Sequence, residues 1–116
     1  MIHILLATYN GARYLRAQLD SIFTQSCDEF KLYVSDDNST DETYNILKEY
    51  ESRYPEKMFI SKSESRLGAA ANFLSLLKNS DANYIMFADQ DDVWHKKKIE
   101  YSLKCMNIME AKYGKD

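Results

Sequence analysis

Short apolar runs alternate along this chain with stretches in which apolar residues recur every three or four positions. The runs indicate buried strands, and they cover residues 2–7, 30–35, 57–61 and 83–88. The stretches between them have the spacing of helices that turn one face toward a core. This alternation predicts an α/β domain with a mainly parallel sheet and helices on both of its faces.

Four helices are expected, one after each strand. The first follows Asn10-Gly11, and the second begins at residue 39 or 40 and ends before Pro55. The third opens at Ala69, and the last runs from residue 93 or 94 to 112. The residues expected to face inward are Leu15, Leu19, Ile22 and Phe23, then Tyr44, Leu47 and either Tyr50 or Glu51, then Phe73, Leu74 and Leu77, and finally Ile99, Leu103, Met106 and either Met109 or Glu110.

Length and composition exclude several classes of protein. The chain has 116 residues with an apolar fraction of 45%, which favours a single domain over residues 1–116. Its net charge is −3 and no basic tract points to nucleic acid. No apolar run approaches the roughly 18 residues of a membrane span, and the start of the chain does not have the pattern of a signal peptide. Cys27 and Cys105 fit neither a zinc pattern nor a disulfide framework, so we expect reduced thiols and a cytoplasmic location.

Two acidic clusters lie where predicted strands end. The first occupies residues 35–41 and includes Asp36 and Asp37, and the second occupies residues 89–92. Crowded carboxylates repel one another and resist burial unless a cation or hydrogen-bond donors compensate. The carboxyl ends of parallel strands are also where ligands bind in open α/β sheets. The two clusters together predict a site for a metal ion and a polar ligand.

The first cluster has two compatible interpretations. Residues 38–41 have the composition of a polar turn and helix cap, while at least one of Asp36 and Asp37 is expected to accept a hydrogen bond from a base or a ribose. Thr8, Tyr9 and Asn10 close the first strand, and Tyr9 offers a flat ring for stacking on a base. Taken alone, the Thr8-Tyr9-Asn10 segment is better explained as an ordinary turn.

Asp89 and Asp91 share one face if their segment is extended. Two carboxylates with no His or Cys beside them suit Mg²⁺ or Mn²⁺ bound together with phosphate oxygens, and the competing interpretation is a solvated acidic loop. Arg66 is expected either near a base or phosphate or simply exposed to solvent. The His-Lys-Lys-Lys run at 95–98 is expected to form a solvated helix face, with a diphosphate or the cytoplasmic face of an anionic membrane as the alternative contacts.

Four motifs in this order resemble the nucleotide-sugar-binding part of family 2 glycosyltransferases. They are Thr8-Tyr9-Asn10, residues 34–41, Arg66-Leu67-Gly68 with Asn72, and residues 87–94, whose Asp-Gln-Asp is a DXD motif. The last motif is similar to that of a bacterial rhamnosyltransferase-like subgroup. The resemblance implies a GT-A fold, a Rossmann-like sheet of strand order 3-2-1-4. It also implies transfer of a sugar, with inversion, from a nucleoside diphosphate to a saccharide or lipid-linked acceptor in cell-surface polysaccharide synthesis.

The resemblance further implies roles for individual residues. Tyr9 would stack on the pyrimidine of a UDP- or dTDP-sugar, and Asp37, with Asp36 as a second candidate, would hydrogen-bond to the base. Arg66 would lie near the base or the phosphates, and Asp91 would bind the metal on the diphosphate. Carried over by position, the nucleotide site comprises Thr8, Tyr9, Asn10, Asp36, Asp37, Arg66 and Asp89, and the Mn²⁺ or Mg²⁺ site comprises Asp91 and Asp89.

In the family, the acceptor site and an acidic catalytic base lie further along the chain than this sequence reaches. We therefore expect an amino-terminal fragment that is inactive alone, has its base beyond Asp116, and has a sheet edge open to self-association. Two hypotheses compete. A sugar-phosphate nucleotidyltransferase should have a loop richer in glycine and arginine after the first strand, and a phosphoacceptor signalling domain should have its paired acids there. A non-catalytic nucleotide-binding domain is a further alternative.

Overall fold

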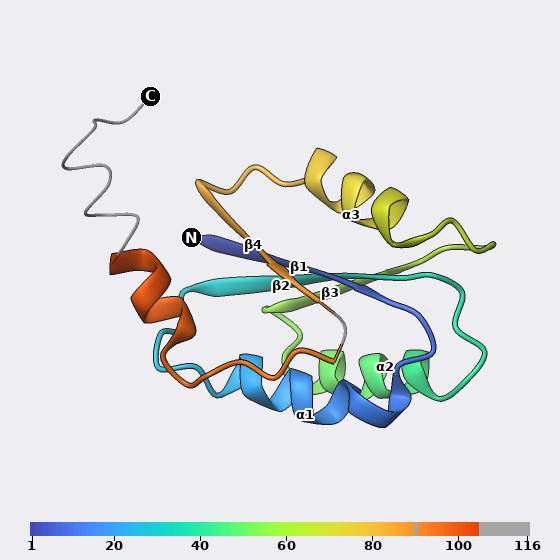
Figure 1. Cartoon of the computed structure of the whole chain (residues 1–116), viewed down its shortest axis with the longest axis horizontal. Helices are drawn as coiled ribbons and strands as arrows, with labels where there is room; N and C mark the ends of the chain where they lie inside the picture. Colours follow the sequence, from blue (N-terminus) through green and yellow to red (C-terminus); the bar gives the residue numbers. More distant parts are fainter. Residues whose placement is uncertain (90, 105–116) are drawn as a thin grey trace.

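The computed structural model describes residues 1–89 and 91–104. Its strands are parallel and form one sheet in the order β3-β2-β1-β4, which confirms the predicted fold class and strand order (Figure 1). The elements are β1 (Ile2–Thr8), α1 (Ala12–Phe23), β2 (Phe30–Asp36), α2 (Thr43–Arg53), β3 (Met58–Lys62), α3 (Ala69–Lys78) and β4 (Tyr84–Ala88). A further helical segment covers residues 98–104.

β1 lies inside the sheet, with β2 on one side and β4 on the other. All seven of its residues are buried, as expected for a parallel strand covered on both faces. The register pairs Thr8 with Asp36 and Leu6 with Ala88, so the carboxyl ends of these three strands lie side by side. Because the connections diverge at β1, this end of the sheet is a topological switch point, where ligands bind in such folds.

The main core lies between the sheet and the helices α1 and α2, which pack on the same face (Figure 1). Leu15, Leu19 and Ile22 of α1 are buried there as predicted. Full burial of each such side chain contributes about 1.5–3 kcal/mol, so this face supplies most of the apolar stabilisation. In α2, Ile46 is buried in place of the predicted Tyr44, which is only half-buried.

Helix α3 covers the opposite face of the sheet, over β1 and β2 (Figure 1). The prediction that Leu74 and Leu77 face inward is wrong, because they are 58% and 40% exposed. The only fully buried side chain of the helix is that of Asn72. Phe73 is half-buried and meets Phe87 of β4 edge to face, with 5.5 Å between ring centroids. α3 therefore fixes its position through a polar contact and one aromatic pair, while Leu76 is half-buried and Leu74 and Leu77 are exposed.

Two helices begin later than predicted. α2 begins at Thr43 because Asp41, not a residue at 39 or 40, accepts a hydrogen bond from the Thr43 amide, at 2.9 Å. The last helix begins at Lys98 instead of 93 or 94, since the preceding residues are bonded to α1. Residues 105–116, with the predicted inward residues at 106 and 109, lie outside the described part. Within the described residues, no helix is long and apolar enough to cross a membrane.

Candidate functional site

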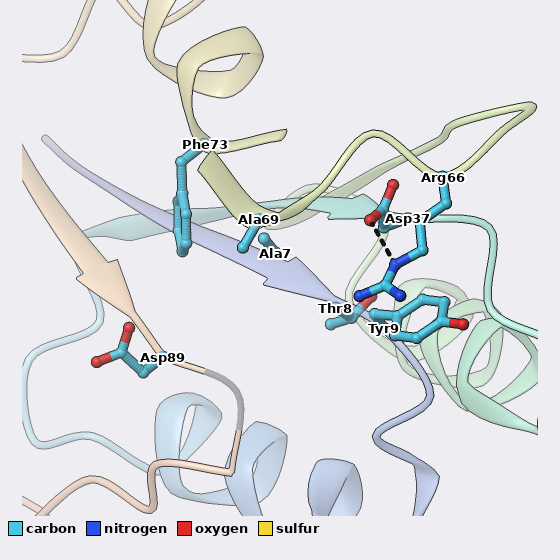
Figure 2. A pocket seen from close by; sticks show the side chains of 8 residues that line it. All are labelled: Ala7, Thr8, Tyr9, Asp37, Arg66, Ala69, Phe73 and Asp89. Atoms are coloured by element: carbon cyan, nitrogen blue, oxygen red, sulfur yellow. Dashed lines mark ion pairs between the residues drawn. The ribbon is translucent and has the colours of Figure 1, made fainter. Parts of the chain in front are cut away.

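A pocket of about 290 Å³ opens at the carboxyl end of β1, between β4 and the start of α3. Its lining residues are Ala7, Thr8, Tyr9, Asp37, Arg66, Ala69, Phe73 and Asp89 (Figure 2). Five of the predicted site residues are therefore brought together from four separate segments of the chain. The sequence analysis expected these residues in one site because they lie at strand ends and in the family motifs, but it assigned no site role to the apolar lining residues.

Asp37 is held in a cradle of hydrogen-bond donors. The amides of Leu67 and Gly68 donate to its two carboxylate oxygens at 2.6 and 2.9 Å, and its own amide donates to the Thr8 carbonyl at 2.8 Å. The residue is only 2% exposed. These contacts tie the end of β2 to the segment before α3. We call Asp37, Leu67 and Gly68 the Asp37 cradle.

The cradle keeps the Asp37 carboxyl ionised despite its burial. Burial alone raises the pKa of this group, because a charge is costly away from water. The Leu67 amide, the Asn72 side chain and the Gly68 amide stabilise the carboxylate more, with a smaller contribution from the nearby Arg66 charge. The net effect is a pKa of Asp37 below its ordinary value, so the pocket contains a fixed anionic acceptor.

Arg66 lies between the carboxylate and the aromatic ring of the pocket. Its guanidinium carbon is 3.8 Å from the centroid of the Tyr9 ring, in cation–π geometry. Its Nε is 3.6 Å from an oxygen of Asp37 (Figure 2). The Arg66 side chain is nevertheless 61% exposed, so solvent weakens the ion pair. Arg66 can therefore move while Asp37 stays in place.

Asn72 and the backbone conformation of Gly68 fix the shape of the Asp37 cradle. The Asn72 Nδ2 donates to the Gly68 carbonyl at 2.9 Å, and its Oδ1 accepts from the hydroxyls of Ser35 and Ser63. Gly68 has φ +94° and ψ 156°, a conformation that is essentially restricted to glycine. The sequence analysis noted both residues as part of a motif, and the structure gives them this mechanical role.

Asp36 and Asn10 do not line the pocket, although both are in the predicted site. Asp36 is fully buried, accepts from the Thr8 hydroxyl at 2.7 Å and is bonded to Ser39 by both carboxylate oxygens. Asn10 accepts from the amides of Thr40 and Asp41 at 2.8 and 3.3 Å. Both side chains fasten the loops at the ends of β1 and β2, and of the two neighbouring aspartates it is Asp37 that faces the pocket.

In the second acidic cluster, Asp89, Asp91 and Asp92 lie at a turn of the chain, which we call the acidic turn. The segment is not extended, contrary to what the sequence analysis assumed, because Asp91 has φ +69° and the Asp92 amide donates back to the Asp89 carbonyl at 3.1 Å. Asp89 lines the pocket, apart from Tyr9 and Arg66 across the end of β1 (Figure 2). Asp92 forms an ion pair with Lys98, with 3.8 Å between Asp92 Oδ2 and Lys98 Nζ. No group of three His, Cys, Asp or Glu side chains suited to a metal occurs among the described residues.

Sequence reasoning missed the polar side chains of α1 that bond to the acidic turn and the residues after it. Gln18 donates to the Asp89 carbonyl, and Ser21 accepts from the Trp94 amide. The available signal was a glutamine between Leu15 and Leu19 on the buried face of an amphipathic helix. A fully buried carboxamide at such a position is costly unless it has a partner.

The parallel sheet and the pocket at its switch point define an α/β domain with a candidate ligand site at the carboxyl ends of its strands. The chain belongs to glycosyl transferase family 2, whose family model matches residues 3–110. This confirms the family indicated by the four motifs.

One curated relative is the dTDP-rhamnosyl transferase RfbG of Shigella flexneri. The two sequences are 41% identical over 110 residues, which cover 91% of this chain and 38% of that protein. The similarity agrees with the rhamnosyltransferase-like subgroup. The chain spans well under half the length of this relative.

Two solved structures extend the comparison to three dimensions. S. aureus TarS 1–349 in complex with UDP has a TM-score of 0.85 and 26% identity, over 94% of this chain and 32% of that one. The mannosyltransferase PcManGT of Pyrobaculum calidifontis, in complex with GDP-Man and Mn²⁺, has a TM-score of 0.81 and 21% identity, over 89% of this chain and 31% of that one. The first supports a shared ancestry and the second supports the fold alone.

Proposed function

We propose that this chain forms the donor-binding part of a glycosyltransferase. The enzyme transfers a sugar from a pyrimidine nucleoside diphosphate to a saccharide or lipid-linked acceptor in cell-surface polysaccharide synthesis. The observation that carries the proposal is the assembly of Tyr9, Asp37 and Arg66 in one pocket, with Asp89 across the end of β1. A protein with the same fold, TarS, binds UDP, and a relative is named as a dTDP-rhamnosyl transferase.

In this proposal the base lies on the Tyr9 side of the pocket. Its ring stacks on Tyr9, and a ring N–H donates to the ionised carboxylate of Asp37, which is an acceptor only. The exposed guanidinium of Arg66 leaves the Tyr9 ring and turns to the phosphates, for which its planar fork of donors is suited. Asp36 and Asn10 act through the loops that they fasten.

The diphosphate lies toward the acidic turn, where Asp89 and Asp91 would hold Mn²⁺ or Mg²⁺. The donor set fits such an ion, because Mg²⁺ bound to phosphates needs only one or two carboxylates and keeps several waters. Both aspartates are exposed, and in the described part of the chain neither has an ion-pair partner. When bound, the ion would act as a Lewis acid on the leaving diphosphate. A mannosyltransferase of the same fold contains Mn²⁺ with its nucleotide sugar.

The proposal is tested by titrating the chain with UDP and with dTDP in Mn²⁺ and measuring heat by calorimetry. Tyr9→Leu should weaken binding about tenfold, since stacking on an aromatic side chain contributes roughly 1–3 kcal/mol per base. Tyr14→Leu is the matched control, because Tyr14 is also partly exposed and also lies beside a guanidinium, that of Arg13, at 5.5 Å. Absence of binding to the unmodified chain, or equal losses in both variants, would refute the proposal.

A further inference from the structure

Three polar side chains form what we call the α1 ladder: Gln18 and Ser21 of α1, and Gln25, which lies two residues after the end of that helix. Gln18 and Ser21 are three residues apart and so lie on one side of α1, and Gln25 donates from Nε2 to the Ser21 carbonyl. The segment that follows β4 runs beside α1 (Figure 1). The contacts of the ladder go to main-chain atoms of that segment: Gln18 Nε2 to the Asp89 carbonyl at 2.5 Å, the Trp94 amide to Ser21 Oγ at 2.9 Å, Gln25 Nε2 to the His95 carbonyl at 2.6 Å and the Ile99 amide to Gln25 Oε1 at 3.0 Å.

Burying the polar side chains of the ladder costs more free energy than burying apolar ones would. Gln18 is fully buried in α1, which otherwise turns leucine and isoleucine toward the core, and Gln25, just after that helix, is 8% exposed. Burying a carboxamide is unfavourable without partners, and Gln18 Oε1 has none among the described residues. Apolar residues at these positions would bury the same area at lower cost. What they could not supply is directional contact, which fixes a backbone in a single position.

The segment held by the ladder contains the acidic turn. Gln18 bonds to the carbonyl of Asp89 itself, and Ser21 bonds to the amide of Trp94, two residues beyond the turn. The ladder therefore grips the chain on both sides of Asp91. Because neither Asp89 nor Asp91 has an ion-pair partner in the described part of the chain, the directions of these carboxylates depend on the backbone that carries them.

We propose that Gln18, Ser21 and Gln25 are positioning residues that hold the acidic turn in the geometry needed for a divalent cation and a diphosphate. This inference rests on the proposed function, since it assigns the acidic turn to the cation. It adds that side chains of α1 fix the backbone on the cation side of the pocket, through hydrogen bonds to main-chain atoms. The base side, built on the Asp37 cradle, does not depend on the ladder.

The test separates the two sides by measuring UDP affinity twice, once in Mn²⁺ and once in EDTA. The ratio of the two affinities reports the contribution of the cation, and the affinity in EDTA reports the base side. Ser21→Ala removes the acceptor of the Trp94 amide, and Ser21→Thr keeps a hydroxyl. Ser52→Ala is the matched control: both serines donate to the carbonyl three residues earlier in their helix at 2.7 Å, but Ser52 is in α2 and outside the ladder.

We expect Ser21→Ala to lower the ratio about tenfold, the lower end of the loss caused by removing outer support from a metal site. The affinity in EDTA should stay within about twofold, Ser21→Thr should restore the ratio, and Ser52→Ala should leave it unchanged. Gln18→Leu should repeat the loss, and hydrogen exchange of the Trp94 amide should be faster in Ser21→Ala, with no nucleotide or metal present.

Three results would overturn the inference: an unchanged ratio in both ladder variants, an equal loss of both affinities, or unchanged exchange at Trp94. An unmodified chain that binds no UDP in either buffer would refute the proposed function itself. The two failures are therefore distinguishable, because the first appears only in the variants and the second in the starting protein.

Discussion

On one side of the pocket Asp37 is 2% exposed and accepts hydrogen bonds from the amides of Leu67 and Gly68. On the other side Asp89 and Asp91 are exposed, and only the backbone around them is bonded. A buried carboxylate with fixed donors suits a ligand group that must match a set geometry. Exposed carboxylates keep their charge available to a cation that brings its own water. Under the proposed function, the rigid half of the pocket would receive the organic ring and the charged half would hold the ion.

The largest expected effect is the removal of the buried carboxylate. Asp37→Ala leaves the Leu67 and Gly68 amides without their acceptor and should lower the free energy of unfolding by about 3 kcal/mol. Urea denaturation measures this, with the exposed acid variant Glu56→Ala as the control. Nucleotide binding should be lost as well. Equal stability of the two variants would show that the cradle does not hold the loop.

A smaller loss is expected when the backbone of the cradle is changed and its carboxylate is kept. Gly68→Ala places a side chain at φ +94°, and the added Cβ would meet no atom within 4 Å. The cost is therefore conformational, about 1–3 kcal/mol, measured by the same denaturation. Stability equal to that of the unmodified chain would mean that the cradle tolerates another backbone conformation.

The exposed side should respond in binding and not in stability. Asp91→Asn removes one charge while keeping a residue that tolerates the left-handed backbone, and it should lower Mn²⁺-supported UDP affinity about tenfold. Asp92→Asn removes the same charge from the same turn, but Asp92 lies toward Lys98 and should have little effect. Both variants should unfold within about 0.5 kcal/mol of the unmodified chain. A tenfold loss in both would indicate a general charge effect in place of a specific ligand.

The smallest effect is expected in acid. The folded-state pKa of Asp37 lies below its ordinary value, so its ionised form contributes stability above the unfolded pKa, about 3.9. That contribution is lost as pH falls from there through the folded pKa. The difference in unfolding free energy between the unmodified chain and Asp37→Asn should therefore be constant near neutral pH and shrink below about pH 4. A difference that grows in acid would contradict the assigned direction.

The strand order was available only through the family resemblance. The sequence itself was sufficient to place Tyr9, Asp37, Arg66 and Asp89 in candidate site motifs, because strand ends and motifs are local signals. It could not choose between Asp36 and Asp37. That choice depends on where β2 ends: Asp36 is still in the strand and buried beside Thr8, whereas Asp37 has left it.

Features that depend on contacts between distant segments could not be predicted. The turn at Asp91 and the α1 ladder exist because the chain after β4 meets a helix some 70 positions earlier. Leu74 was predicted to be buried from helical spacing alone, but spacing does not show how far a sheet extends under a helix.

The guanidinium above Tyr9 means that this ring is already stacked before any nucleotide arrives. A base that replaces the Arg66 guanidinium on Tyr9 gains only the difference between its own stacking energy and that of the guanidinium. The ring therefore contributes modestly to affinity for a nucleoside without phosphates. A nucleoside diphosphate also offers the displaced cation a new anion. The pocket would then prefer a nucleoside diphosphate to a nucleoside, because only the diphosphate gives Arg66 a new partner when the base replaces it on the Tyr9 ring.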